Sequence, residues 1–489
     1  MGSISRRLFL EQSMLAAAAA AGSAEPLFAA GKRKKQPPQK AKKRVSPNER
    51  IRVAVIGARG RGGDHCKAFE ALEDCVLVCV CDADTAVGEK TAAKFQSKPK
   101  FVQDLRRVFD DKSIDVVSIA TPNHWHALAA IWAMQAGKDV YVEKPVCHNI
   151  SEGRRMVQVS RKHNRICQGG TQHRSEGHIR AAAQYLREGK LGQVKLIHTY
   201  TYRLRAPIGP PGDYPVPPTV DYNLWAGPAP VQQPLRRKSF HYDWHWFWDY
   251  GNGELGNNSI HPVDASRLIT GLKGLGSRVM SYGGRVGMQN DAGETPSVQI
   301  TIHDFGPVTL VQEVRELKTP DRQKDGTLMV VGSEGSLVTG RGVALVFDPS
   351  GKQVAELRGP DENHFANFIK AVKSRKREEQ NAEIEEPFIS TSVVHVGNIS
   401  QRLGKPASPK EIQAALESLQ VNENVVETFD LIRRHLAENQ VDIEKTPLAL
   451  GPWLAVDSEH ERFIDSPAAD AFLTRDYRKP FVVPAENEI

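Results

Sequence analysis

Apolar runs alternate with helix-like stretches through residues 51–172, and this alternation restricts the fold more than any other feature of the sequence. Continuous apolar runs such as IRVAVIG (51–57) are typical of strands that are covered on both faces. Because parallel neighbours need a helical crossover between them, the alternation predicts a parallel, doubly wound sheet. The expected strands are 51–57, 76–82, 115–121, 139–145 and 166–172, and the expected helices are 62–74, 85–96, 123–136 and one capped by Ser151.

A change of pattern near residue 174 marks a second domain. After a predicted helix at 176–190, the chain becomes rich in β-forming residues with short hairpin-like breaks. The expected strands are 194–203, 297–305, 308–316 and 327–340, and helices return beyond Asn363. We therefore predict an α/β chain with a doubly wound domain at 50–173 and an α+β domain at 174–489. The second domain should hold a large, mostly antiparallel open sheet and a helical C-terminal tail.

The N-terminus has the pattern of an export signal. The sequence RRLFL (6–10) precedes an Ala-rich apolar run, similar to a twin-arginine signal peptide. This run is shorter than the ~20 residues of a membrane span. We expect residues 1–30 to direct the folded chain to the periplasm or another extracytoplasmic space through the twin-arginine machinery, with cleavage after Ala24 or Ala30 left open. The basic stretch at 31–49 cannot bury apolar surface and is expected to be a disordered linker.

Charge and cysteine placement exclude several classes of protein. Residues 1–50 hold eleven Lys and Arg against three Glu, a net charge of +8, while the whole chain carries +7. Residues 51–489 therefore carry −1, which argues against a nucleic-acid partner. All six cysteines lie between Cys66 and Cys167. We interpret them as buried core residues and not as a disulfide framework. Because no CxxC spacing occurs, we expect no metal site.

The first apolar run leads into a glycine-rich turn suited to a nucleotide phosphate. Gly57, Gly60 and Gly62 allow a tight turn at the start of a predicted helix, whose amides would face a pyrophosphate. Arg59 stands where a strict GxGxxG motif has glycine and can add a charge near the phosphates. Asp82 ends the next strand, 20 residues after Gly62, where a carboxylate binds the adenosine ribose. Such a carboxylate would repel a 2′-phosphate, so we expect NAD rather than NADP.

Two later motifs carry candidate chemistry. Glu143-Lys144-Pro145 falls at the carboxyl end of a predicted strand, the edge where such sheets bind ligands, and Lys144 can orient and acidify a substrate hydroxyl. Asn257, His261 and Asp264 have the spacing i, i+4, i+7, which would place them on one face of a helix. An imidazole titrates near neutral pH and suits proton transfer.

In combination these motifs resemble the Gfo/Idh/MocA family of sugar and polyol oxidoreductases. The similarity runs from about Ile51 to the tail and includes TPNHWH (121–126), GKLG (189–192) and LWAGPAP (224–230). The resemblance implies a Rossmann domain that binds NAD and a second domain whose open sheet forms a homodimer or homotetramer. It further implies that Thr121, Pro122, Asn123 and His126 line the cofactor, that Glu143 and Lys144 face the nicotinamide ribose and the substrate, and that His261 is the general acid/base.

Asn257 departs from this pattern, because the family commonly has Asp four residues before the His. Asn257 can hydrogen-bond a substrate hydroxyl, but it carries no charge and cannot accept a proton. Proton transfer would then fall on His261 and Lys144. The same difference keeps open a non-catalytic carbohydrate-binding protein that retains its nucleotide.

The Pro-, Gly- and aromatic-rich segment 205–250 is expected to form a long structured loop. Its aromatic run FHYDWHWFWDY (240–250) suits either a packed core or a wall on which a sugar stacks. Further candidate substrate contacts are Arg174, Tyr202, Trp246 and Asp264, and for Arg174 a structural ion pair is equally open.

The leading hypothesis is an exported NAD-dependent oxidoreductase of carbohydrate metabolism. It would transfer a hydride between a hydroxyl of a sugar, polyol or glycoside and a tightly bound nicotinamide cofactor. Outside the cytoplasm no soluble NAD pool would restore the cofactor, so the redox cycle should close within the site. It could close by reducing a second sugar, or by running as a redox-neutral, NAD-dependent glycoside hydrolase.

Overall fold

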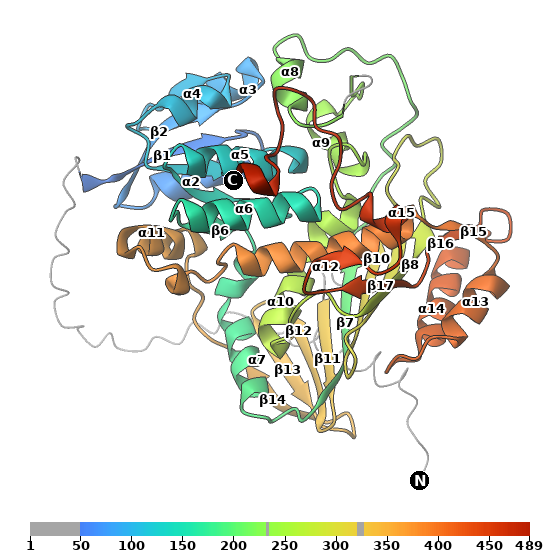
Figure 1. The fold of residues 1–489 in the computed structure, drawn as a ribbon. Coiled ribbons are helices and arrows are strands. Elements are labelled where there is room, and N and C mark those ends of the chain that lie inside the picture. Colours follow the sequence, from blue (N-terminus) through green and yellow to red (C-terminus); the bar gives the residue numbers. More distant parts are fainter. Residues whose placement is uncertain (1–48, 231–233, 320–326) are drawn as a thin grey trace, which may run out of the picture.

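A computed structural model describes residues 49–230, 234–319 and 327–489 (Figure 1). The predicted signal at 1–30 and all but the last residue of the predicted linker at 31–49 lie outside these residues. None of the helices in the described ranges is long and apolar enough to cross a membrane.

The first domain is a six-stranded sheet in which every pairing is parallel, with strand order β3-β2-β1-β4-β5-β6. This confirms the predicted doubly wound sheet. Its strands are β1 (Ile51–Ile56), β2 (Cys75–Cys81), β3 (Lys100–Val102), β4 (Val116–Ile119), β5 (Asp139–Val142) and β6 (Cys167–Gly169). Its helices are α2 (Arg61–Glu70), α3 (Thr85–Ala92), α4 (Leu105–Asp110), α5 (Asn123–Gln135) and α6 (Ile150–Lys162). The six cysteines are buried free thiols.

Two local predictions in this domain need correction. Ser151 does not cap α6, because the helix begins at Ile150 and the side chain of Asn149 accepts a hydrogen bond from the Glu152 amide at 3.0 Å. Strand β3 was not predicted, since it is a three-residue edge strand without a continuous apolar run. The predicted strand 139–145 ends at Val142, which leaves Glu143 and Lys144 just beyond the carboxyl edge of the sheet.

The second domain contains a twelve-stranded sheet that is antiparallel except for the pairing of β7 with β10. This confirms the predicted mostly antiparallel sheet. The strands are β7 (Val194–Tyr202), β8 (Arg278–Gly284), β9 (Val298–Asp304), β10 (Thr309–Arg315), β11 (Thr327–Gly332), β12 (Gly335–Gly340), β13 (Val343–Phe347), β14 (Gln353–Leu357), β15 (Lys405–Ala407), β16 (Leu448–Leu450), β17 (Leu454–Asp457) and β18 (Arg462–Phe463). The predicted strand at 327–340 is the hairpin formed by β11 and β12.

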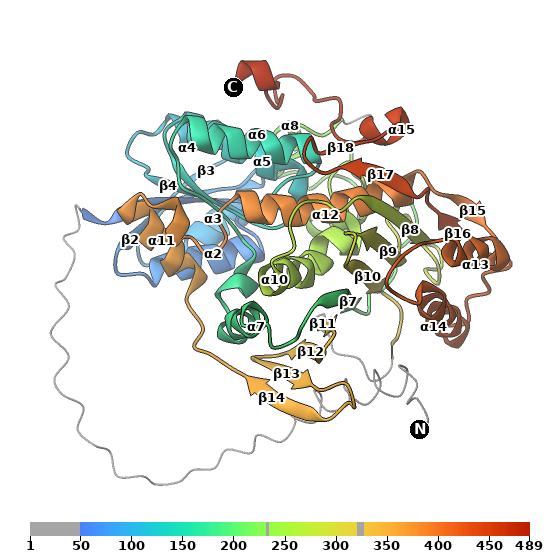
Figure 2. The same cartoon turned by 60° about the horizontal axis from the view of Figure 1, so that its bottom comes forward.

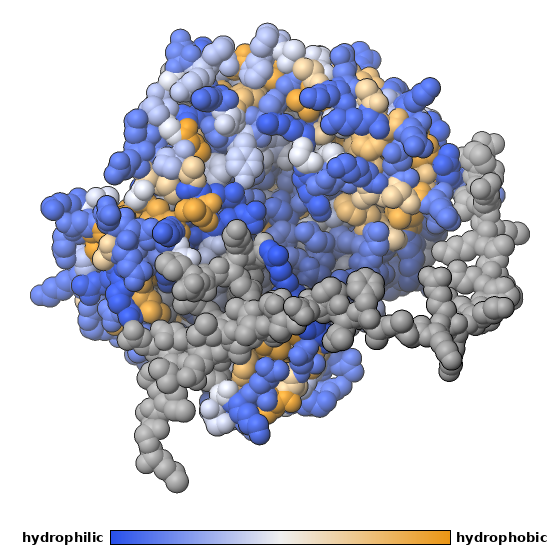
Figure 3. All heavy atoms as spheres, turned by 180° about the vertical axis from the view of Figure 1, so that it is seen from behind, coloured by the Kyte–Doolittle hydropathy of each residue, from blue (hydrophilic) through white to orange (hydrophobic). Residues whose placement is uncertain are grey.

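Helices cover both faces of this second sheet. Helices α7 (Gly177–Arg187), α10 (Ile260–Thr270) and α12 (Glu385–Arg402) pack on the face toward the first domain, and Figure 2 shows α10 and α12 between the two sheets. On the opposite face, α13 (Pro409–Glu417) and α14 (Val425–Glu438) join a separate core in which Phe429 meets the edge of Tyr282. On the back of the molecule, the atoms that are not grey are mostly hydrophilic, and apolar residues form several separate groups (Figure 3).

Two segments from beyond residue 174 pack on the first domain. Helix α11 (His364–Ser374) places Phe368 in the core beneath β1 and β2, beside Phe69. Near the C-terminus, Phe481 is 1% exposed and packs against Trp125 of α5. Both segments therefore return to the first domain, and Phe481 near the C-terminus packs on α5.

The loop at 205–250 also returns to the first domain. It contains α8 (Tyr222–Ala226), α9 (Phe240–Asp243) and a 3₁₀ turn at Trp244–Trp246. The Asp221 amide donates to the Ala83 carbonyl at 2.9 Å, and the Thr85 amide donates to the Thr219 carbonyl at 3.0 Å. Figure 1 shows α8 and α9 reaching the edge of the first sheet near α3 and α5. This loop therefore forms a wall opposite the carboxyl edge of the parallel strands.

We predict that Phe481→Ala lowers the free energy of unfolding of the first domain by about 3 kcal/mol, because it leaves a cavity against Trp125. Thermal unfolding followed by tryptophan fluorescence measures this loss. The matched control is Val482→Ala, whose side chain is exposed and should change stability by less than about 0.5 kcal/mol. Equal changes for the two variants would contradict the bracing role of the tail.

Candidate active site

A cavity of about 880 Å³ opens where β1, β2, β4 and β5 end, between the first sheet and the aromatic loop. It brings together most of the site residues that the sequence predicts. Those that line it are Gly57, Arg59, Gly60, Asp82, Thr121, Pro122, Asn123, His126, Glu143, Lys144 and Asn257. Their convergence follows from the parallel sheet, because the carboxyl ends of its strands meet at one edge.

The glycine turn is built for close backbone approach. Gly57 has φ +82°, and a Cβ there would lie 2.6 Å from the Ala120 carbonyl oxygen. A Cβ on Gly62 would collide with the Gly57 carbonyl, so α2 can start this close to β1 only with glycine. The N-terminus of α2 thus lies directly at the cavity wall, where helix amides attract a phosphate group.

Asp82 secures the same turn from the neighbouring strand. Its carboxylate accepts from the Ala58 amide at 2.7 Å and from the Asp84 amide at 2.9 Å. Each oxygen keeps acceptor capacity for a ribose hydroxyl. The cap of α3 is Asp84, whose other oxygen lies 2.8 Å from His241 Nε2 in the aromatic loop. Asp82 is therefore free of the capping role that is the simplest alternative for an aspartate at a strand end.

Glu143 is an anchored carboxylate at the floor of the cavity. It accepts from Arg61 Nε at 2.8 Å and contacts His65 Nε2 at 3.0 Å. Burial disfavours its charge, but His65 and Arg61 outweigh burial and hold the pKa of Glu143 well below its usual range. Glu143 therefore stays ionised and binds the start of α2 to the end of β5.

Lys144 joins the two domains through one main-chain carbonyl. Its Nζ donates to the Asn257 carbonyl at 2.7 Å and to Asn257 Oδ1 at 3.3 Å. Asn257 lies in a π-helical turn, Leu255–Ser259, that precedes α10. In the π register its carbonyl would accept from residue 262, which is Pro and has no N–H. Burial lowers the pKa of Lys144, while Glu143 and Glu254 oppose that effect.

His261 is a half-buried, neutral imidazole next to this contact. It follows the π turn on α10 and stacks on His173 with ring centroids 4.7 Å apart. Burial, followed by the charges of His173 and Lys144, holds the pKa of His261 well below its usual value. Its Nδ1 is buried without a hydrogen-bond partner among the described residues. Nδ1 of His261 is therefore available to bond a ligand.

The four predicted substrate contacts do not line this cavity in the described structure. Asp264 is fully buried and pairs with Arg174 at 2.7 Å, so the alternative of a structural ion pair holds for both residues. Tyr202 lies on the far face of the second sheet and donates to Glu313 at 2.8 Å. Trp246 lies behind the wall. The predicted common helix face fails because the π turn offsets Asn257 from Asp264.

The aromatic run does supply the wall opposite the glycine turn. The cavity is lined there by Trp225, Lys238, Ser239, His241, Tyr242, Trp244 and His245. The sequence predicted that this run could contact a sugar, but the residue it named, Trp246, does not line the cavity, whereas Trp244 does. Lys238, Ser239 and Gln172 also line the cavity, and nothing in the sequence pattern distinguished them.

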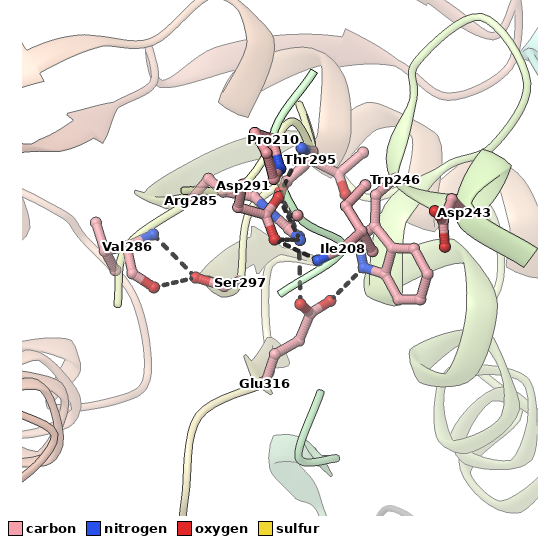
Figure 4. A network of polar contacts seen from close by, with 12 residues as sticks. Ile208, Pro210, Asp243, Trp246, Arg285, Val286, Asp291, Thr295, Ser297 and Glu316 are labelled. Atoms are coloured by element: carbon pink, nitrogen blue, oxygen red, sulfur yellow. Dashed lines mark hydrogen bonds and ion pairs between the residues drawn. The ribbon is translucent and has the colours of Figure 1, made fainter. Parts of the chain in front are cut away.

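A charged network fixes the wall from behind (Figure 4). The Trp246 indole donates to Glu316 at 2.9 Å, and Arg285 bridges Glu316 at 3.3 Å and Asp291 at 3.1 Å. Burial raises the pKa of Glu316 to about 8, with the charge of Glu254 adding to this effect and Arg285 opposing it. Glu316 therefore binds a proton more readily than an exposed glutamate does.

We predict that Glu316 makes stability fall as pH rises. Its pKa is higher in the folded chain than in the unfolded chain, so its contribution is complete below about pH 4.5 and is lost up to about pH 8. Relative to Glu316→Gln, the wild type should lose up to about 1.4 kcal/mol of stability per pH unit in that window. Melting temperatures of both proteins from pH 5 to 8 test this. The exposed Glu334→Gln should run parallel to the wild type, and a parallel course for Glu316→Gln would contradict the prediction.

The fold and the cavity together define a two-domain protein with a dinucleotide-type Rossmann domain. Residues 51–171 match the family model described as "Oxidoreductase family, NAD-binding Rossmann fold", and residues 211–428 match the C-terminal alpha/beta domain of the same family. The chain belongs to the Gfo/Idh/MocA oxidoreductase family.

Individual relatives are distant. Levoglucosan dehydrogenase of Pseudarthrobacter phenanthrenivorans is 29% identical over 231 residues, 46% of this chain and 52% of that protein. Alpha-N-acetylgalactosaminidase of Shewanella oneidensis is 32% identical over 127 residues, 24% of this chain and 28% of that protein. The chain thus spans about half, or less, of the length of these relatives. A solved structure of levoglucosan dehydrogenase in complex with NADH superposes with a TM-score of 0.54 at 19% identity, covering 71% of this chain and 95% of that one, which shows the shared fold.

Proposed function

We propose that this chain is an exported, NAD-dependent oxidoreductase that transfers a hydride between a carbohydrate hydroxyl and a tightly held cofactor. The observation that carries the proposal is one cavity that joins the Gly57 turn and Asp82 to Lys144, with the neutral His261 one turn beyond Asn257. The carbohydrate can be a sugar, a polyol or a glycoside. Export rests on the RRLFL sequence at 6–10.

The chain's own residues fit a dinucleotide. The close glycine turn and the start of α2 suit a pyrophosphate, and Asp82 lies where a ribose would bind. A carboxylate there favours NAD over NADP, because a 2′-phosphate would be repelled. Thr121 Oγ1 is buried without a protein partner in the described residues and lies at the same wall. When bound, the nicotinamide ring supplies the hydride acceptor.

Lys144 and His261 divide the remaining work. Lys144 is held by the Asn257 carbonyl and can donate to the substrate oxygen, which stabilises the charge that develops there. The neutral ring of His261 can accept the hydroxyl proton at a ring nitrogen. Asn257 donates no proton in this scheme and serves to bind Lys144 and to hydrogen-bond the substrate.

The aromatic loop supports tight retention of the cofactor. Lys238, Ser239 and His241 cover the cavity next to Asp82, and His241 is bound to Asp84 at 2.8 Å. A nucleotide seated below this cover can leave only if these contacts open. Retention suits an exported enzyme, because the cofactor must be restored in place.

A redox-neutral glycoside hydrolase is the second candidate. It is favoured by the similarity of 127 residues of the chain to alpha-N-acetylgalactosaminidase and by the aromatic wall, which suits the apolar face of a glycoside. In both candidates His261 and Lys144 keep the same roles.

We predict that the purified protein, denatured and freed of polypeptide, releases about one NAD per chain, as one Rossmann site requires. Mass spectrometry identifies the nucleotide.

In the intact protein, His241→Ala should exchange bound NAD for free labelled NAD about 10- to 100-fold faster, because a charge-assisted hydrogen bond is lost. The exposed His460→Ala is the control. Finding no nucleotide, or rapid exchange in the wild type, would contradict tight retention.

We predict that His261→Ala lowers turnover at least about 100-fold while the bound nucleotide is retained, because the general base is removed. Turnover is measured, without added cofactor, as oxidation of levoglucosan with a second sugar supplied as the hydride acceptor, or as release of 4-nitrophenol from its N-acetyl-α-galactosaminide. Unchanged turnover would remove His261 from the mechanism. Carbohydrate binding without turnover in both wild type and variant would instead identify a non-catalytic binding protein.

A further inference from the structure

We propose that Tyr242 positions the substrate by donating a hydrogen bond from its hydroxyl to a carbohydrate oxygen, and that Arg205 and Glu254 are the positioning residues that set its direction. This inference rests on the proposed carbohydrate substrate and extends it to a specificity-determining contact.

Tyr242 is exposed to the cavity. Tyr242 lies on α9 and lines the wall opposite the glycine turn. Its side chain is 43% exposed, whereas Phe240, Trp244 and Trp246 of the same loop are buried. Its ring packs at a tilt against His245 and Trp246, so the ring is held while its edge remains accessible. Tyrosine with an apolar body and a polar tip suits an amphipathic sugar.

The contact to Arg205 decides how the Tyr242 hydroxyl can act. Arg205 Nη1 donates to Tyr242 Oη at 2.9 Å. A guanidinium group has no acceptor, so the hydroxyl must accept in this bond and its own proton must point elsewhere. With Arg205 on one side, that proton is available as a donor to an oxygen of the ligand. The geometry therefore favours an acceptor such as a ring, hydroxyl or carbonyl oxygen.

Arg205 is itself fixed at several points. Its Nη2 donates to Glu254 Oε2 at 2.9 Å, its amide donates to the Glu316 carbonyl at 2.9 Å, and its guanidinium lies over the Trp246 ring at 5.6 Å. The Coulombic attraction to the buried Glu254 raises the pKa of Arg205 against the effect of burial. Arg205 therefore presents a fixed donor to Tyr242.

Glu254 connects Arg205 to Asn257, the residue that holds Lys144. It is 1% exposed, accepts from Asn257 Nδ2 at 3.4 Å and also accepts from the side-chain Nδ2 of Asn258. Asn257 in turn holds Lys144. One buried carboxylate thus holds both Tyr242, through Arg205, and the π turn that carries Asn257. A ligand between Tyr242 and Lys144 would accept hydrogen bonds from both side chains. The distance between these two donors is set by their shared connection to Glu254.

The test compares Tyr242→Phe with wild type on the NAD-containing protein, with levoglucosan and 4-nitrophenyl N-acetyl-α-galactosaminide as probes. Loss of one hydrogen bond should lower kcat/KM about 3- to 10-fold, mainly by raising KM, and should leave the nucleotide content unchanged. Arg205→Gln should lower kcat/KM at least as far, because it also leaves the buried Glu254 carboxylate without its ion pair. The double variant should lose no more than Arg205→Gln alone, because the two side chains act as one unit. Tyr214→Phe, in the same loop but away from the cavity lining, is the matched control.

Calorimetric binding of the same probes separates this inference from the proposed function. Binding that weakens in Tyr242→Phe without turnover in the wild type would overturn the oxidoreductase activity and support the inference. Equal affinity and equal kcat/KM for wild type and Tyr242→Phe would overturn the inference alone. Additive losses in the double variant would overturn the role of Arg205, and absence of probe binding by the wild type would overturn both proposals.

Discussion

The contact between the Lys144 ammonium group and the Asn257 carbonyl holds the site together. Lys144 lies two residues beyond the carboxyl end of β5 in the first domain. Asn257 lies in the π turn that precedes α10 of the second domain. In a π register the donor to this carbonyl would be residue 262, which is Pro and has no N–H, and the Lys144 ammonium group donates to the carbonyl. Because the two elements come from different domains, this bond helps to set the distance between the glycine turn and His261, together with contacts such as the one from Asn123 Nδ2 to Asn252 Oδ1 at 3.1 Å.

The second constraint is the loop that carries the aromatic wall. A segment so rich in Pro and Gly has few regular hydrogen bonds of its own, so its position depends on contacts with other elements. Main-chain bonds of Thr219 and Asp221 with Thr85 and Ala83 hold the middle of the loop on the first domain. Trp246, buried against Glu316 and Arg285, holds its C-terminal part on the second. The aromatic wall is therefore bonded to both domains, and the shape of the cavity depends on both sets of hydrogen bonds.

Sequence reasoning located the nucleotide-type half of the cavity because a parallel sheet gathers its strand ends at one edge. Gly57, Asp82 and Lys144 are each placed by that rule, without knowledge of any side-chain contact. The second half depended on helix register, and an α-helical spacing put Asn257 on the same face as His261 and Asp264, whereas Asn257 lies in a π turn that precedes α10. Tyr202 and Trp246 failed for a related reason. Strand or loop membership was predicted, but which face of the sheet or wall each side chain occupies depends on long-range packing.

The neutral side chain at position 257 has an electrostatic consequence for His261. Glu254 brings a negative charge close to the π turn, but Arg205 is paired with it, and Glu143 is paired with Arg61. The charge of Lys144 adds to burial in lowering the pKa of His261, and Glu143 opposes this effect. An aspartate at 257 would add an anion there and raise the pKa of His261. Asparagine thus keeps the imidazole ready to accept a proton, while Lys144 remains fixed through the backbone.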